Sequence, residues 1–137
     1  MSDLFKSKGD GARPLLSGGI LGIASLPAYL MLQHVNSILL AALILVLIAG
    51  VYLGYAFSDG RWKIIATEGV VASVFLGAAF IGVSGWQWAI PIAFALHGLW
   101  DAAHHSRVGT IMPHWYIPFC AVYDWATAAG LCLIWLS

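Results

Sequence analysis

The stretch HGLWDAAHH, residues 97–105, carries histidines and an aspartate at the spacing of one helix face. Asp101 follows His97 by four residues, and His104 and His105 come three and four residues later. Residues three or four apart on a helix have Cβ atoms about 5–6 Å apart, near enough to share a metal ion or a hydrogen bond. Imidazole and carboxylate ligands suit zinc or iron, and a non-haem iron typically takes two histidines and one carboxylate. This stretch therefore predicts part of a divalent metal site.

A second polar stripe follows in YIPFCAVYDW, residues 116–125. Tyr116, Cys120 and Asp124 are spaced by four residues and Thr127 follows three later, so these side chains share one helix face. If the two segments are neighbouring helices, the two stripes can face each other. Asp124 then becomes a candidate ligand for the same ion.

The spacing leaves several ligand sets open. His97 and His104 are about 10 Å apart along a helix axis, too far to bind one ion without help. An ion would be held by His97 with Asp101, or by Asp101 with His104 or His105, and completed by Glu68, Asp124 or His114. We predict zinc or iron as the cofactor, with these ligands: His97, Asp101, His104, His105 and Asp124. The predicted catalytic residues are Glu68 and Asp124, as further ligands or as the general base.

Composition determines which elements position these residues. Of 137 residues, 61% are hydrophobic and 9% are charged, whereas an ordinary globular domain has about 25% charged residues. Six Lys/Arg and six Asp/Glu cannot cover the surface that a soluble fold of this size leaves exposed. A soluble domain, a disordered chain and a nucleic-acid partner bound through a basic face are therefore excluded. The composition predicts an integral membrane protein.

Five apolar stretches are separated by short polar breaks. Each is close to the length of about 20 residues that spans a bilayer as a helix, and an open strand would leave backbone groups unpaired in lipid. We predict an all-α fold, a single transmembrane domain over residues 1–137 with five transmembrane helices, at about 14–33, 38–57, 63–83, 86–105 and 115–135. Gly18-x3-Gly22 and Gly50-x3-Gly54 have the spacing that lets helices approach closely.

All six Lys and Arg residues fall on one side of this arrangement. Three precede the first span, Arg61 and Lys63 join the second and third spans, and Arg107 joins the fourth and fifth. The positive-inside rule makes that side cytoplasmic. We therefore expect a cytoplasmic N-terminus, an external C-terminus, and a multi-pass protein of a bacterial-type inner (plasma) membrane.

The ionisable residues inside the predicted spans converge at one depth. Each costs roughly 2.5–3.5 kcal/mol on insertion scales. At about 1.5 Å per residue, Glu68, His97 and Asp124 lie about 8, 12 and 14 Å from the cytoplasmic ends of their spans. A structural interpretation also fits: His97 and Asp101 as a buried pair bonded to Asp124, with the other histidines as interfacial polar groups. Convergence in one half of the membrane favours a functional site, because chance would scatter such costly groups.

Three resemblances rest on these motifs. The string H-x3-D-x2-H-H resembles part of a histidine box of membrane fatty-acid desaturases and hydroxylases, which bind two irons. Asp101 replaces the first histidine of that box, and this chain has one box where that superfamily has three. HGLW is similar to the H-x3-H helix of alkaline ceramidases and related membrane zinc hydrolases, with Asp101 at the second histidine. The pattern HxxWDxxHH followed by W-x3-FCxxYDW resembles small bacterial multi-pass membrane proteins of unassigned function. That resemblance implies that His97, Asp101, His104, His105 and Asp124 form one motif.

These observations lead to one main hypothesis and two alternatives. The main hypothesis is a metal-dependent membrane enzyme whose cytoplasm-facing site acts on a lipid or other hydrophobic substrate that enters from the bilayer. The metal would activate water toward an ester or amide, or dioxygen toward a lipid chain. One alternative is a proton, ion or small-molecule transport subunit; the other is an accessory subunit of a larger membrane complex. Expected partners are membrane lipids, the hydrophobic substrate, and a homo-oligomer or larger complex.

Overall fold

The computed structural model describes residues 11–104 and 108–137, and these residues form five α-helices joined by short connections. The helices are α1 (Ala12–Met31), α2 (His34–Asp59), α3 (Trp62–Val83), α4 (Ala89–Ala103) and α5 (Tyr116–Leu136). No strand occurs among the described residues. The predicted all-α fold is therefore confirmed.

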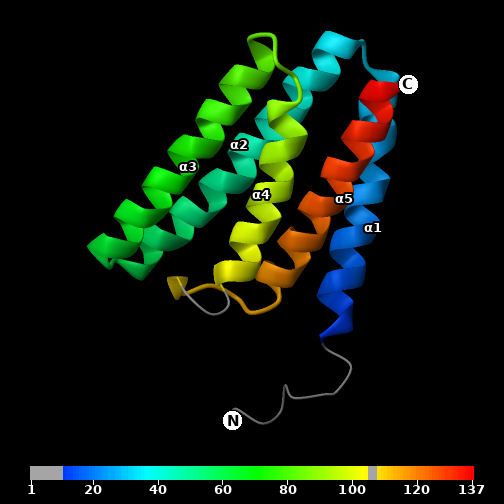
Figure 1. The fold of residues 1–137 in the computed structure, drawn as a ribbon. Helices are drawn as coiled ribbons and strands as arrows, with labels where there is room; N and C mark the ends of the chain where they lie inside the picture. Colours follow the sequence, from blue (N-terminus) through cyan, green and yellow to red (C-terminus); the bar gives the residue numbers. More distant parts are fainter. Residues whose placement is uncertain (1–10, 105–107) are drawn as a thin grey trace.

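The helices run alternately in opposite directions and form a bundle (Figure 1). The start of α1, the α2–α3 turn and the α4–α5 connection lie at one end. The other two connections and the C-terminus lie at the opposite end. α1 packs mainly on α5 and α2 on α3, while α4 contacts α2, α3 and α5. The helix that carries HGLWDAA thus has neighbours on three sides.

Four helices, α1, α2, α3 and α5, are long and apolar enough to cross a membrane, which indicates a multi-pass membrane protein. α4 differs, because its 15 residues extend only about 22 Å against a hydrocarbon thickness of about 30 Å. It is shorter than the predicted span at 86–105, since a turn with Gly85 at φ +133° precedes it. Pro91 falls in its first turn, where a missing N–H breaks no helix hydrogen bond.

α2 begins at His34 rather than at the predicted Ile38. Two of the polar residues that suggested a break, His34 and Ser37, are hydrogen-bonded to side chains of another connection or helix. His34 Nε2 lies 2.7 Å from Oε1 of Gln87, and the indole N–H of Trp135 donates to Ser37 Oγ at 3.1 Å. The break between α1 and α2 is therefore shorter than predicted and lies at residues 32–33.

Two glycines allow α1 to approach α5 closely. A Cβ on Gly18 would lie 2.2 Å from the carbonyl oxygen of Phe119, and one on Gly22 would lie 2.8 Å from Cβ of Ala126. The close approach predicted for Gly18-x3-Gly22 is confirmed. A Cβ on Gly50 or Gly54 would meet nothing within 4 Å, so the second glycine pair makes no such contact among the described residues.

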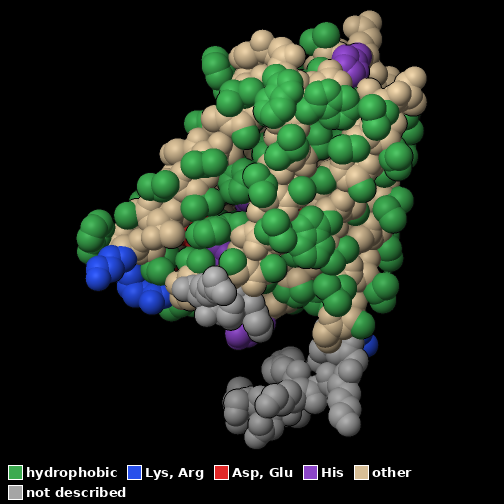
Figure 2. Space-filling view, in the orientation of Figure 1, with side chains coloured by type: hydrophobic (Ala, Val, Ile, Leu, Met, Phe, Trp, Pro, Cys, Tyr) green, Lys and Arg blue, Asp and Glu red, His purple; other side chains and the backbone are tan. Residues whose placement is uncertain are grey.

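Hydrophobic side chains cover most of the visible surface, and Lys and Arg side chains lie at its lower end (Figure 2). Large apolar side chains on several helices are well exposed, including Leu47, Phe80 and Leu133 at 68–72%. In water such a surface would aggregate, whereas in a bilayer it contacts lipid chains. The interior holds an apolar core that includes Leu45, Ile90, Phe94 and Leu131, and the buried ionisable groups lie beside it.

Candidate functional site

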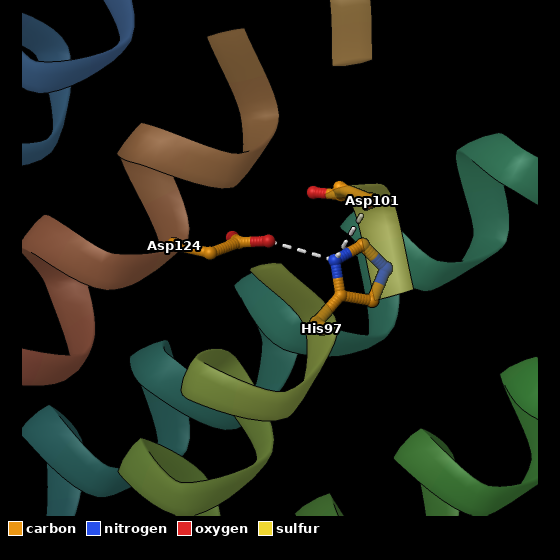
Figure 3. A group of neighbouring side chains, drawn as sticks. All are labelled: His97, Asp101 and Asp124. Carbon is orange, nitrogen blue, oxygen red and sulfur yellow. Dashed lines mark hydrogen bonds and ion pairs between the residues drawn. The ribbon is translucent and has the colours of Figure 1, made fainter. Parts of the chain in front are cut away.

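Helices α4 and α5 bring His97, Asp101 and Asp124 together inside the bundle (Figure 3). His97 and Asp101 lie one turn apart on α4, and Asp124 faces them from α5. Nδ1 of His97 is hydrogen-bonded to Oδ2 of Asp124 at 2.7 Å and lies 3.5 Å from Oδ1 of Asp101. One potential ligand atom from each residue lies within 4.8 Å of the other two. We call these three residues the carboxylate group.

The carboxylate group is buried, and it has fewer hydrogen-bond donors than acceptors. Its side chains are at most 1% exposed. Both carboxylate oxygens of Asp101 and Oδ1 of Asp124 lack hydrogen-bond partners within the described part of the chain. An unpaired buried carboxylate is costly unless a proton or cation neutralises it. Two carboxylates outweigh one imidazole even when the imidazole is protonated, so the group has a place for a cation or an additional proton.

The distances test this group as a metal site. Ligand atoms about 2.0–2.2 Å from a tetrahedral zinc ion lie about 3.4 Å from one another. The 3.5 Å between His97 Nδ1 and Asp101 Oδ1 matches that separation. The 2.7 Å contact between His97 and Asp124 is shorter and is the length of an N–H···O hydrogen bond. These two separations fit a divalent ion once His97 gives up its Nδ1 proton and Asp124 withdraws by about 0.7 Å. The ligand atoms of Asp101 and Asp124 lie within 4.8 Å of each other.

Two aromatic rings from helices α2 and α3 enclose His97. The ring of Tyr52 on α2 and that of Phe75 on α3 have centroids 5.4 and 4.8 Å from the imidazole. The Tyr52 hydroxyl faces Asp101 without a hydrogen bond of normal geometry. Thr127, one turn after Asp124, is also fully buried with an unpartnered hydroxyl. The sequence does not predict Tyr52 and Phe75 as part of the site, because an aromatic side chain in an apolar span most often only packs against its neighbours. In addition, the apolar stretch of α2 has no Asp, Glu, His, Lys or Arg that would have drawn attention to it.

A second buried cluster lies beside the α4–α5 connection. Nε2 of His104 is hydrogen-bonded to Oε1 of Glu68 on α3, and the hydroxyl of Thr110 donates to the same oxygen at 2.8 Å. Nδ1 of His104 lies 3.0 Å from the Trp100 carbonyl oxygen. A carbonyl only accepts, so Nδ1 carries a hydrogen and one further proton is shared between Nε2 and the carboxylate. We call Glu68, His104 and Thr110 the balanced cluster, since one carboxylate meets one imidazole.

Side chains of the α2–α3 turn are hydrogen-bonded to residues 109–111, the segment that covers the balanced cluster. Arg61 donates to the carbonyl oxygen of Gly109 at 2.7 Å, and the backbone N–H of Ile111 donates to Asp59 at 3.0 Å. Arg61 and Asp59 are paired with each other, and this pairing raises the pKa of Arg61 above its ordinary value. Thr110, between these two anchor points, therefore reaches inward to Glu68.

The predicted site residues thus fall into separate places. His97, Asp101 and Asp124 come together, while Glu68 and His104 pair with each other in the balanced cluster. The Tyr52 ring lies between the two, 4.7 Å from the His104 ring and 5.4 Å from the His97 ring. His114 lines a cavity of about 320 Å³ together with His104 and Thr110. His105 lies outside the described residues.

The fold and site define a class: an all-α membrane protein with a buried histidine–carboxylate group between two of its helices. Residues 14–135 match the model of DUF6010, a family of unknown function, and the chain belongs to this family. No curated protein matches the chain, and no solved structure does.

Proposed function

We propose that this protein is a metal-dependent membrane enzyme that acts on a lipid or other hydrophobic substrate. The carboxylate group holds the metal, zinc or iron, through His97, Asp101 and Asp124. A divalent cation supplies Lewis acidity at such a site, either to activate water toward an ester or amide or to activate dioxygen toward a lipid chain. Asp124 is a ligand or a general base in this proposal, and Glu68 is the base supplied from the neighbouring cluster.

One observation carries the proposal: three carboxylate oxygens in the carboxylate group are buried without hydrogen-bond partners. A purely structural histidine–aspartate pair is expected to satisfy its oxygens with donors, because buried polar groups are almost always hydrogen-bonded. A cation bound among these oxygens removes the deficit.

The proposal includes five membrane crossings with the N-terminus in the cytoplasm of a bacterial-type cell. The short helix α4 completes its crossing with the turns on either side of it. Arg13, Arg61 and Lys63 lie at the same end of the bundle as the α4–α5 connection, which supports a cytoplasmic position for that end. The balanced cluster is then near the cytoplasmic surface, and the carboxylate group lies deeper.

The test is elemental analysis of protein purified in mild detergent and never exposed to chelator. We expect stoichiometric zinc or iron in the natural protein and its loss in Asp124→Asn. Asp59→Asn is the matched control: it makes the same change at a carboxylate of the α2–α3 turn, and we expect it to keep its metal. A natural protein without stoichiometric metal, or an Asp124→Asn variant with full metal content, would contradict the proposal.

The balanced cluster supports a second candidate, a proton-transport subunit, because one exchangeable proton is shared between Glu68 and His104. Carboxylates and histidines inside membranes often mark such paths. Proton flux into liposomes that is lost in Glu68→Gln, in protein that contains no metal, would favour this candidate over the enzyme.

A further inference from the structure

An apolar groove of about 400 Å³ runs between α3 and α4 on the outside of the bundle. Side chains from both helices line it: Val71, Val74 and Phe75 from α3, with Leu96, Leu99 and Trp100 from α4. Val74 and Leu99 are 64% and 58% exposed, so the groove is open to the surroundings of the bundle. No ionisable side chain lines it.

The depth of the groove determines what surrounds it. Val71 and Phe75 lie nine and thirteen residues after the start of α3 at Trp62, which is about 14 and 20 Å along the helix. For a helix that crosses a hydrocarbon layer of about 30 Å, this is the middle of the membrane. The medium at that depth is lipid chains, which matches the lining of the groove.

The floor of the groove is a single layer of aromatic rings over the buried histidines. The Phe75 ring lies edge-on to His97, with centroids 4.8 Å apart. The Trp100 ring lies in the same way against His104, at 4.9 Å. The groove therefore comes within one side chain of the carboxylate group at Phe75 and of the balanced cluster at Trp100.

We propose that this groove binds the hydrocarbon chain of a membrane lipid and that Phe75 is the gate between that chain and His97. The part of this inference that makes the bound lipid a substrate rests on the proposed function; the binding site itself does not. If the bound lipid is the substrate, the groove selects a lipid with a reactive group along or at the end of an alkyl chain. That group reaches the site from within the bilayer. A soluble molecule has no route through this groove.

The probe is a phosphatidylcholine with a photoactivatable diazirine in the middle of one acyl chain, diluted into phosphatidylcholine vesicles that contain the protein. We expect adducts on the segments 71–75 and 96–100, and a several-fold lower yield there in Leu99→Trp, which fills the groove. Leu76→Trp is the matched control, because Leu76 is 55% exposed against 58% for Leu99 and is not among the lining residues. Its adduct yield in the groove should equal that of the natural protein.

The gate is tested with Phe75→Leu, which keeps an apolar side chain but removes the ring. We expect new adducts on His97 or Asp124 in this variant and not in Phe80→Leu, whose ring is 68% exposed on the same helix. Groove adducts that are unchanged in Leu99→Trp would overturn the binding site. A change of oligomeric state in Leu99→Trp without a change in adducts would do so too, because the groove would then hold a second copy of the chain.

Metal content measured on the same samples keeps the two proposals separate. We expect Leu99→Trp to retain its metal, since it changes the groove and not the ligands. Groove adducts in a protein without metal would uphold the lipid site and reject the metal enzyme. Metal without groove adducts would do the opposite.

Discussion

The two buried clusters are built from the same residue types and differ in their balance. In the balanced cluster one carboxylate meets one imidazole, and Thr110 donates to the carboxylate oxygen that His104 also contacts. In the carboxylate group two carboxylates surround one imidazole, and three of their oxygens have no partner. The balanced cluster also leaves one oxygen, Oε2 of Glu68, without a partner, but its single carboxylate is matched by one imidazole. The additional carboxylate of the carboxylate group has no such match, so it needs a cation or an additional proton. In the proposed function the balanced cluster therefore holds a shared proton, with Glu68 as the base, and the carboxylate group holds the cation.

The two clusters also differ in the elements that hold their side chains in place. The balanced cluster depends on Thr110, in a connection anchored by Asp59 and Arg61 of the α2–α3 turn. The carboxylate group draws all its members from the interior faces of α4 and α5, with Tyr52 and Phe75 closing the other sides. A site fixed by helices keeps its geometry better than one fixed by a connection, which suits metal ligands.

The largest effect is expected for Asp101→Asn. Loss of this ligand should weaken metal binding by more than the roughly 10–100-fold that loss of an outer partner costs. In the presence of chelator the variant should be at least as stable as the natural protein, because the amide removes a buried charge that has no partner. Thermal unfolding with and without chelator, together with elemental analysis, measures both effects. A chelated variant that unfolds well below the chelated natural protein would place Asp101 in a structural pair instead.

The opposite pattern is expected for Glu68→Ala. Removing one partner of a buried pair leaves the other unsatisfied and typically costs about 3–5 kcal/mol, so the free energy of unfolding should fall by that order. Metal content should not change, because Glu68 lies outside the carboxylate group. Ser73→Ala on the exposed face of α3 serves as the control, and it should change stability little. If Glu68→Ala loses metal as completely as Asp101→Asn, the two clusters are one site and the comparison fails.

The sequence predicts the elements better than the clusters. Apolar length alone identifies five helices, and the spacing of His97, Asp101 and His104 places them on one face of α4. A face about 100° wide can contact two neighbouring helices. The spacing does not indicate which part of that face contacts which helix. In the structure α5 meets the His97 part through Asp124, and α3 meets the His104 part through Glu68. Tyr52 and Phe75 come from distant segments, so only the packing of helices shows their place beside His97.

A smaller effect is expected for Thr110→Val, which keeps the shape of the side chain and removes its donor to Glu68. Losing one hydrogen bond to a buried charged group costs about 1.5–3 kcal/mol. Denaturant or thermal unfolding measures the loss, and the metal should remain bound. Thr67→Val is the matched control, because the Thr67 hydroxyl is bonded to the Lys63 carbonyl on an exposed face. A loss for Thr110→Val no larger than for Thr67→Val would show that the connection contributes little to the balanced cluster.

The smallest effect is expected for Tyr52→Phe, the substitution at the residue between the clusters. The ring contacts with His97 and His104 remain, so stability in chelator should change by less than about 1 kcal/mol. The hydroxyl faces Asp101. In the proposed metal site it would orient this ligand carboxylate, so the affinity for metal should fall by about 10-fold. Tyr55→Phe is the control, since the Tyr55 ring contacts Tyr116 rather than either histidine. An unchanged metal affinity combined with a large loss of stability would mean that the Tyr52 hydroxyl supports the fold rather than the carboxylate group.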